Sequence, residues 1–194
     1  MGSAWDHPQL GRFKHDADGG SWIGTVDIPA FKAFVYDGIT NPRYKGPRRQ
    51  SAGKHVLAFE ADDETDVPSP KAIALASKML VNQKKLVAMV VQALWDDFNG
   101  RGPNSGMWWH GDLRQVAEAM WADLPPPKVR DDLLRLMKLM GITIRKGVYR
   151  YDKPVVELSF AAPFEDEHGI GVLTDGRSIL GTGYSADVTP FEAR

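Results

Sequence analysis

The chain contains no cysteine among its 194 residues. This absence excludes disulfide bonds, thiolate metal sites and cysteine nucleophiles, and it is typical of a protein in a reducing cytoplasm. Long apolar runs are also missing, since no stretch approaches the roughly 20 residues that cross a bilayer. The first residues contain no apolar core of a secretory signal. The sequence therefore predicts a cytoplasmic protein without a membrane partner.

A large excess of one charge is missing as well, because the formal net charge is -1. The whole molecule therefore offers no general attraction to nucleic acid. One basic run could contact phosphates; it consists of Arg43, Lys45, Arg48, Arg49 and Lys54. An acidic run follows and offsets its field; it consists of Glu60, Asp62, Asp63, Glu64 and Asp66. We interpret both runs as solvated loops.

Motifs that hold cofactors or activate nucleophiles are also absent. The chain has no Walker loop, no His-Glu-x-x-His and no Gly-x-Ser-x-Gly, which are the local signatures of those sites. We predict no cofactor and no bound metal. Catalytic groups can also assemble from distant segments without any motif, so an enzyme stays open as an alternative.

What the chain does contain is the composition of an ordinary folded domain, with 43% hydrophobic and 25% charged residues. We predict one domain over residues 1–194. Period-two alternation in "SWIGTVDI" places Trp22, Gly24, Val26 and Ile28 on one face of a strand. A further strand is expected in "AFKAFVY", and another in "HVLAFEA".

The middle of the chain has helical periodicity. Ser69 and Pro70 are a typical helix start, and an apolar stripe continues to Phe98, as one helix or as two with a break at Asn82-Gln83. A capping box predicts a second helix over Asp112–Trp121, and a third is expected over Lys128–Met140.

Strands return toward the C-terminus. Hairpins are predicted within "ITIRKGVYRY" and at Asp175-Gly176, with the strand "VVELSF" between them. The order of strands, helices and strands predicts an α+β fold. We expect an antiparallel sheet of N-terminal and C-terminal strands with a central set of about three to four helices.

Two short stretches are candidates for a binding site. In "MWWHGD", Trp108, Trp109 and His110 precede Asp112, the predicted helix N-cap. Tryptophan is frequent in binding hot spots, but the core interpretation of both rings is favoured, because large aromatic side chains bury most of their area. We predict a protein partner or ligand here if the rings are exposed.

The second stretch, "EDEHGIGVLTDGRSILGTG", places Glu165, Asp166, Glu167 and His168 before two Gly-x-Gly pairs. Neighbouring residues of an extended segment point to opposite sides, so these four side chains do not converge on a metal. The glycine pairs lack the third glycine and the helix of a dinucleotide site, so we interpret them as structural. Glu165, Glu167 and His168 stay candidates for contact with a partner or ligand.

Two stretches resemble an uncharacterised bacterial domain family of unknown function. They are the helical "PSPKAIALASKMLVNQKKLVAMVVQALWDDF" and the closing "EDEHGIGVLTDGRSILGTGYSADV", which ends in Ala186-Asp187. The family is loosely associated with immunity-type accessory proteins that bind a toxin. The resemblance implies a non-catalytic protein-binding domain and assigns no functional residue.

Two other classes of function remain as alternatives. The helices over Asp112–Trp121 and Lys128–Met140 followed by a hairpin are similar to a winged helix, but Asp131 and Asp132 oppose DNA in the recognition helix, and nucleic acid is disfavoured. In a winged helix, the residues that contact phosphate would be Lys128, Arg130, Arg135 and Lys138. An enzyme would use His110, Asp112, the acids 165–167 and His168.

Overall fold

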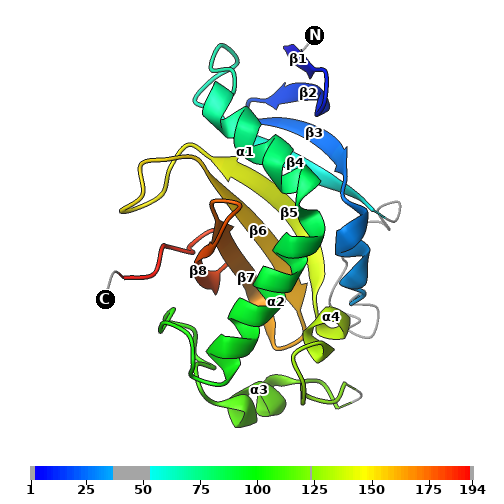
Figure 1. Ribbon diagram of the computed structural model, residues 1–194, viewed down its shortest axis with the longest axis vertical. Coiled ribbons are helices and arrows are strands. Elements are labelled where there is room, and N and C mark those ends of the chain that lie inside the picture. The colour runs from blue at the N-terminus through cyan, green and yellow to red at the C-terminus, as the bar shows by residue number, and fades with distance from the viewer. Residues whose placement is uncertain (1–2, 37–52, 123, 193–194) are drawn as a thin grey trace.

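The computed structural model describes residues 3–36, 53–122 and 124–192. Within these residues, eight strands form one sheet whose spatial order follows the chain (Figure 1). The strands are β1 (Ala4–His7), β2 (Gly11–Asp16), β3 (Ser21–Asp27), β4 (Lys54–Glu60), β5 (Lys138–Arg145), β6 (Val155–Ala162), β7 (Glu165–Thr174) and β8 (Ile179–Tyr184). Neighbouring strands are antiparallel except β4 and β5, which run parallel.

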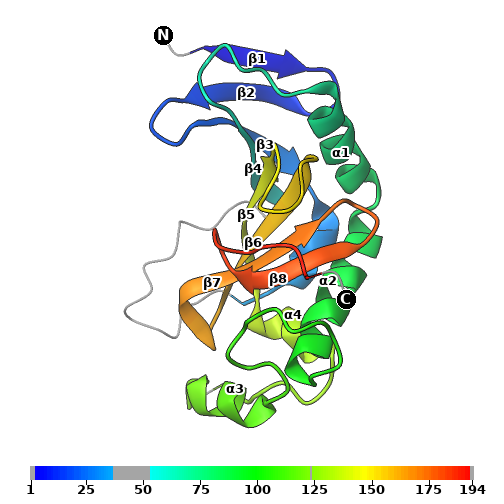
Figure 2. The same cartoon turned by 90° about the vertical axis from the view of Figure 1, so that its left-hand side faces the viewer.

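The predicted fold class is therefore wrong in two respects. The sheet is mixed and not antiparallel throughout, and it dominates the molecule, so the helices are not central. The helices connect β4 to β5, and α1 and α2 lie along one face of the sheet (Figure 2). A parallel pair needs a long crossover connection, which the helical segment supplies. The hydrophobic periodicity of a strand does not indicate from which end of the sheet the chain enters it. The direction of β5 relative to β4 could therefore not be inferred from the sequence.

The alternation predicted in β3 is confirmed. Trp22, Gly24 and Val26 are buried and face the helices, together with neighbours from β2 and β4 such as Phe13 and Phe59. The strand expected in "AFKAFVY" is wrong, because residues Pro29–Ala33 form a 3-10 helix, η1. Pro29 has a fixed φ that suits a helical first turn.

The first helical segment consists of two helices, which decides the alternative left open above. They are α1 (Pro70–Val81) and α2 (Gln83–Phe98), and Asn82 lies between them. The Ser69 side chain caps α1 by accepting a hydrogen bond from the Ala72 N–H at 3.2 Å, as its position predicted. The Asn82 side chain donates to the Lys78 carbonyl, and this bond marks the end of α1.

The second predicted helix is present but shorter, as α3 (Leu113–Ala119). The third prediction is confirmed only for its middle, because α4 covers Asp132–Leu136, residues 128–131 form bends and turns, and β5 already begins at Lys138. Leu136, Met137 and Leu139 are all buried, and such a short apolar run fits helix and strand periodicity equally. A winged helix would need a full recognition helix at this position. The winged-helix alternative therefore lacks the helix that would enter the DNA groove.

The C-terminal strands follow the prediction in part. The hairpin at Asp175-Gly176 is confirmed, with Gly176 in the left-handed region at φ 76° and Asp175 accepting from two backbone N–H groups of the turn. The hairpin expected within "ITIRKGVYRY" is wrong, because β5 pairs with β6 and only an isolated bridge joins Val148 to Tyr151.

None of the helices in the described ranges combines the length and apolar character that a bilayer crossing requires. The basic run predicted around residues 43–49 lies outside the described residues, and only its last member, Lys54, is placed, at the start of β4.

Candidate functional site

Three of the predicted site residues meet in space although they are far apart in sequence. The Trp108 indole N–H donates to Glu165 Oε2 at 2.8 Å. The other oxygen of the same carboxylate lies 3.2 Å from the backbone nitrogen and 3.2 Å from Nδ1 of His168. Glu165 is buried, at 7% exposure, and a buried carboxylate needs such donors. The three side chains therefore form an internally bonded cluster.

The exposed side of this cluster is a small hollow of about 210 Å³, lined by His168, Glu167, Ser159 and Ser185 among others. The His168 ring is half exposed and packs against Tyr184 in a tilted arrangement, with centroids 4.8 Å apart and ring planes at 50°. Burial, followed by the negative charges of Glu165 and Glu167, raises the pKa of Tyr184. Within the described residues, no group of three or more potential ligand side chains could hold a metal ion.

Trp109 does not line a surface. It has 0% exposure and packs against Phe98 and Phe164, with ring centroids 5.3 and 5.5 Å away. Its indole N–H has no acceptor among the described residues, so the ring contributes by packing alone. Of the two interpretations of the tryptophan pair, Trp109 therefore follows the core one, and Trp108 is partly buried with its N–H engaged.

His110 belongs to a second carboxylate cluster, centred on Asp97 of α2. Asp97 is 1% exposed and accepts hydrogen bonds from the Thr182 hydroxyl at 2.6 Å and the Ser105 hydroxyl at 2.9 Å, while His110 Nδ1 lies at 3.3 Å. These bonds join α2, the following loop and β8. Sequence reasoning missed Asp97, although an acid three residues after Leu94 on the buried stripe of a helix is a signal of a buried carboxylate.

Asp112 has a third, separate role as the N-cap of α3. Its carboxylate accepts from the backbone N–H groups of Arg114 and Gln115 and from the Gln115 side chain at 2.9 Å. The N-cap half of the predicted capping box is therefore confirmed, but the reciprocal half is not, because the Asp112 N–H donates to the Trp109 carbonyl. The Gln115 side chain, followed by the backbone N–H groups of Gln115 and Arg114, lowers the pKa of Asp112.

The polar residues suggested for an enzyme thus divide among three local arrangements. Neither His110 nor His168 has a serine or threonine hydroxyl hydrogen-bonded to its ring among the described residues.

One glycine of each Gly-x-Gly pair provides room for the C-terminal tail, residues 185–192, which folds back over β8. A Cβ on Gly181 would lie 2.1 Å from the Thr189 carbonyl oxygen, and one on Gly171 would lie 2.8 Å from the Val188 side chain. The Phe191 N–H then donates to the Leu180 carbonyl at 2.7 Å. Gly171 and Gly181 are therefore structural, as the sequence indicated, because a side chain at either position would displace the tail.

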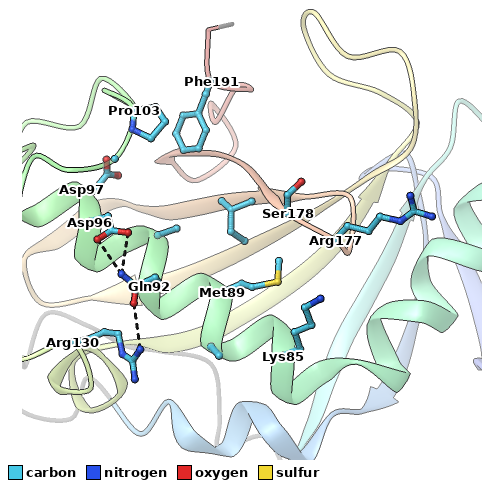
Figure 3. A pocket seen from close by; sticks show the side chains of 14 residues that line it. Lys85, Met89, Gln92, Asp96, Asp97, Pro103, Arg130, Arg177, Ser178 and Phe191 are labelled. Atoms are coloured by element: carbon cyan, nitrogen blue, oxygen red, sulfur yellow. Dashed lines mark hydrogen bonds between the residues drawn. The ribbon is translucent and has the colours of Figure 1, made fainter. Parts of the chain in front are cut away.

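This tail forms one wall of a groove beside α2. The groove has about 550 Å³ of space between the solvent side of α2, the β7–β8 hairpin and Phe191 (Figure 3). Its floor and walls include the apolar side chains of Ala88, Met89, Ala93 and Ile179. Ala88 is exposed, and Met89 and Ala93 are half-buried. Apolar concave surfaces of this size are typical binding sites.

Charged side chains border the two ends of the groove differently. Lys85 and Arg177 flank one end from opposite sides (Figure 3), and neither forms an ion pair with another described residue. At the other end, Asp96 is paired with Arg101 at 3.2 Å and accepts from Gln92, which in turn accepts from Arg130. Among the described residues that line the groove, the cations without an acidic partner are therefore Lys85 and Arg177, and both lie at one end. Asp97, by contrast, is buried and hydrogen-bonded to Thr182 and Ser105.

Comparison with models of protein families, with curated proteins and with solved structures finds no match. The geometry alone therefore carries the functional argument.

Sequence reasoning missed the groove, but a signal was present. Six residues recur at helical spacing on the side of α2 opposite its core stripe, namely Lys85, Ala88, Met89, Gln92, Ala93 and Asp96. Small and apolar residues on the outer side of an amphipathic helix indicate a face without its partner.

Proposed function

We propose that this chain is a non-catalytic protein-binding domain that contacts its partner through the groove beside α2. The observation that carries the proposal is a concave surface on the outer side of α2, where Ala88 is exposed and Met89 and Ala93 are only half-buried. Exposed apolar surface is costly in water unless a partner covers it. The site differs from the one expected at Trp108 and Trp109, whose rings are engaged internally.

The two histidine–carboxylate pairs support the non-catalytic part of the proposal. Both carboxylates are buried and their oxygens accept structural hydrogen bonds from other segments, namely from Trp108 in one case and from Thr182 in the other. Neither histidine ring is hydrogen-bonded to a serine or threonine hydroxyl among the described residues, so neither pair activates a hydroxyl nucleophile. The immunity-type role and the toxin partner implied by the family resemblance stay a prediction.

The proposal is tested with a matched pair of substitutions on exposed helical alanines. Ala88→Arg places a bulky side chain in the groove, whereas Ala74→Arg makes the same change on an exposed position of α1 outside it. The tagged native chain and both variants are used for affinity capture from the organism that encodes the chain. We expect one stoichiometric protein partner with the native chain and with Ala74→Arg, and its loss with Ala88→Arg.

Two outcomes would contradict the proposal. Equal capture by Ala88→Arg would place the partner surface elsewhere on the molecule. Recovery of nucleic acid in place of a protein, lost as salt increases, would favour the nucleic-acid alternative.

A further inference from the structure

We infer that the groove receives an amphipathic helix of the partner whose polar side carries glutamate or aspartate next to Lys85 and Arg177. This inference rests on the proposed function and identifies the chemistry of the segment that binds. Three features of the described residues carry it: the charge at one end of the groove, the shape of its floor, and the state of the neighbouring strand edge.

The charge of the groove selects acidic side chains. Lys85 and Arg177 lie on opposite sides of one end and have no acidic partner among the described residues. The nearest acid of the hairpin, Asp175, already accepts from the backbone of Arg177 and Ser178 and interacts with Lys78. At the opposite end, Asp96 is neutralised by Arg101. A carboxylate between Lys85 and Arg177 would therefore find two unpaired cations, whereas an ammonium group would be repelled.

The floor of the groove suits a helix. Ala88 and Ala93 are small, so the backbone of a second helix can approach α2 closely, and Met89 between them is a flexible side chain that adapts to a partner. The stripe from Lys85 to Asp96 extends about 16 Å along α2 at a rise of about 1.5 Å per residue. This length matches about three turns of a bound helix. An amphipathic helix that lays its apolar face in such a groove is a common mode of peptide recognition.

The strand edge beside the groove argues against an extended occupant. A peptide that adds a strand needs free backbone groups at the sheet edge. Along β8, the Leu180 carbonyl is already used by the Phe191 N–H, and the tail continues past Gly181. The groove therefore contacts its occupant through side chains and does not supply backbone hydrogen bonds. The occupant must pair its own backbone N–H and C=O groups, as a helix does.

The test uses two synthetic amphipathic peptides of about 18 residues, long enough to form helix on binding. Both have the same leucine and alanine face, and their polar faces carry glutamate in one and lysine in the other. Fluorescence anisotropy measures the Kd of each for the full chain at low salt. We expect the glutamate peptide to bind at least about tenfold more tightly, and the preference to shrink as salt rises.

A double substitution and a charge-matched control locate the effect. Lys85→Glu with Arg177→Glu is expected to abolish or reverse the preference for the glutamate peptide. Arg12→Glu with Lys14→Glu changes two exposed cations of β2 by the same net charge, and it should retain the preference. Circular dichroism and the Tm establish that both variants fold as the native chain does.

Other outcomes overturn the inference. Equal binding of the two peptides, absence of binding by both, or a preference that survives the groove substitutions would each contradict an acidic helix. Binding to anionic phosphatidylserine vesicles without binding to either peptide would assign the groove to a membrane surface. The two proposals can also fail separately. If the native chain captures a protein partner, Ala88→Arg does not, and the two peptides bind with equal Kd, the proposed function stands and only the acidic helix is rejected.

Discussion

The cluster around Trp108 and the groove beside α2 use their residues in opposite ways. Around Trp108, groups that usually attract attention as catalytic candidates are bonded to each other: Glu165 is buried and holds both the indole and His168. In the groove, the residues are ordinary, but Lys85 and Arg177 have no ion-pair partner within the described residues, and Ala88 faces solvent. A residue with rich chemistry can thus be structural, while a plain helix face carries the surface that lacks a partner.

The strongest way to test this contrast is to remove the buried carboxylate of Asp97. Asp97→Ala leaves the Thr182 and Ser105 hydroxyls and His110 without their acceptor. We expect the free energy of unfolding to fall by about 3 kcal/mol, measured by urea denaturation. Asp96→Ala, at the half-buried neighbour, should cost less than about 1 kcal/mol. Equal losses for the two variants would show that Asp97 does not hold the segments together.

The hydrogen bond between Trp108 and Glu165 is the next largest effect. Trp108→Phe keeps an aromatic ring and removes the N–H that bonds the buried carboxylate at 2.8 Å. The expected loss is about 2 kcal/mol, because a bond to a charged group is stronger than a neutral one. A double-mutant cycle with Glu165→Gln should give a coupling energy of about 1 kcal/mol. Strict additivity would contradict a direct interaction.

The tail that forms a wall of the groove is tested by two glycines on one strand. A Cβ on Gly181 would overlap the Thr189 carbonyl oxygen at 2.1 Å, whereas on Gly183 it would meet the Val188 Cα at an ordinary 3.4 Å. Gly181→Ala should destabilise the fold by about 1.5 kcal/mol, while Gly183→Ala should stay within about 0.5 kcal/mol of the native chain. Thermal unfolding measures both. Identical Tm values would mean that the tail does not pack on β8.

The groove cations are expected to have the smallest effect on folding. Lys85→Ser with Arg177→Ser removes two side chains that form no ion pair with another described residue. The free energy of unfolding should change by less than about 0.5 kcal/mol, even though the same positions control the charge of the proposed site. A loss above about 1 kcal/mol would show that the two cations stabilise the fold, and the contrast with the Trp108 cluster would disappear.

Local sequence signals were sufficient for several elements because the interactions behind them are local. The Ser69 and Asp112 caps, the period-two face of β3 and the turn at Asp175-Gly176 each depend on residues within a few positions of each other. Where two periodicities fit one short apolar run, as before Lys138, the local signal failed and a strand replaced the expected helix.

The candidate residues could be selected from the sequence, but their relations could not. Trp108 and Glu165 are 57 residues apart, and Asp97 and Thr182 are 85 apart. These contacts exist only once the crossover brings β5 parallel to β4 and the last hairpin against α2. The order of the residues along the chain was enough to propose strands, helices and caps, since their energies are set by neighbours. The mixed sheet and the groove depend on which distant surfaces meet, and that was decided by the packing of the whole chain.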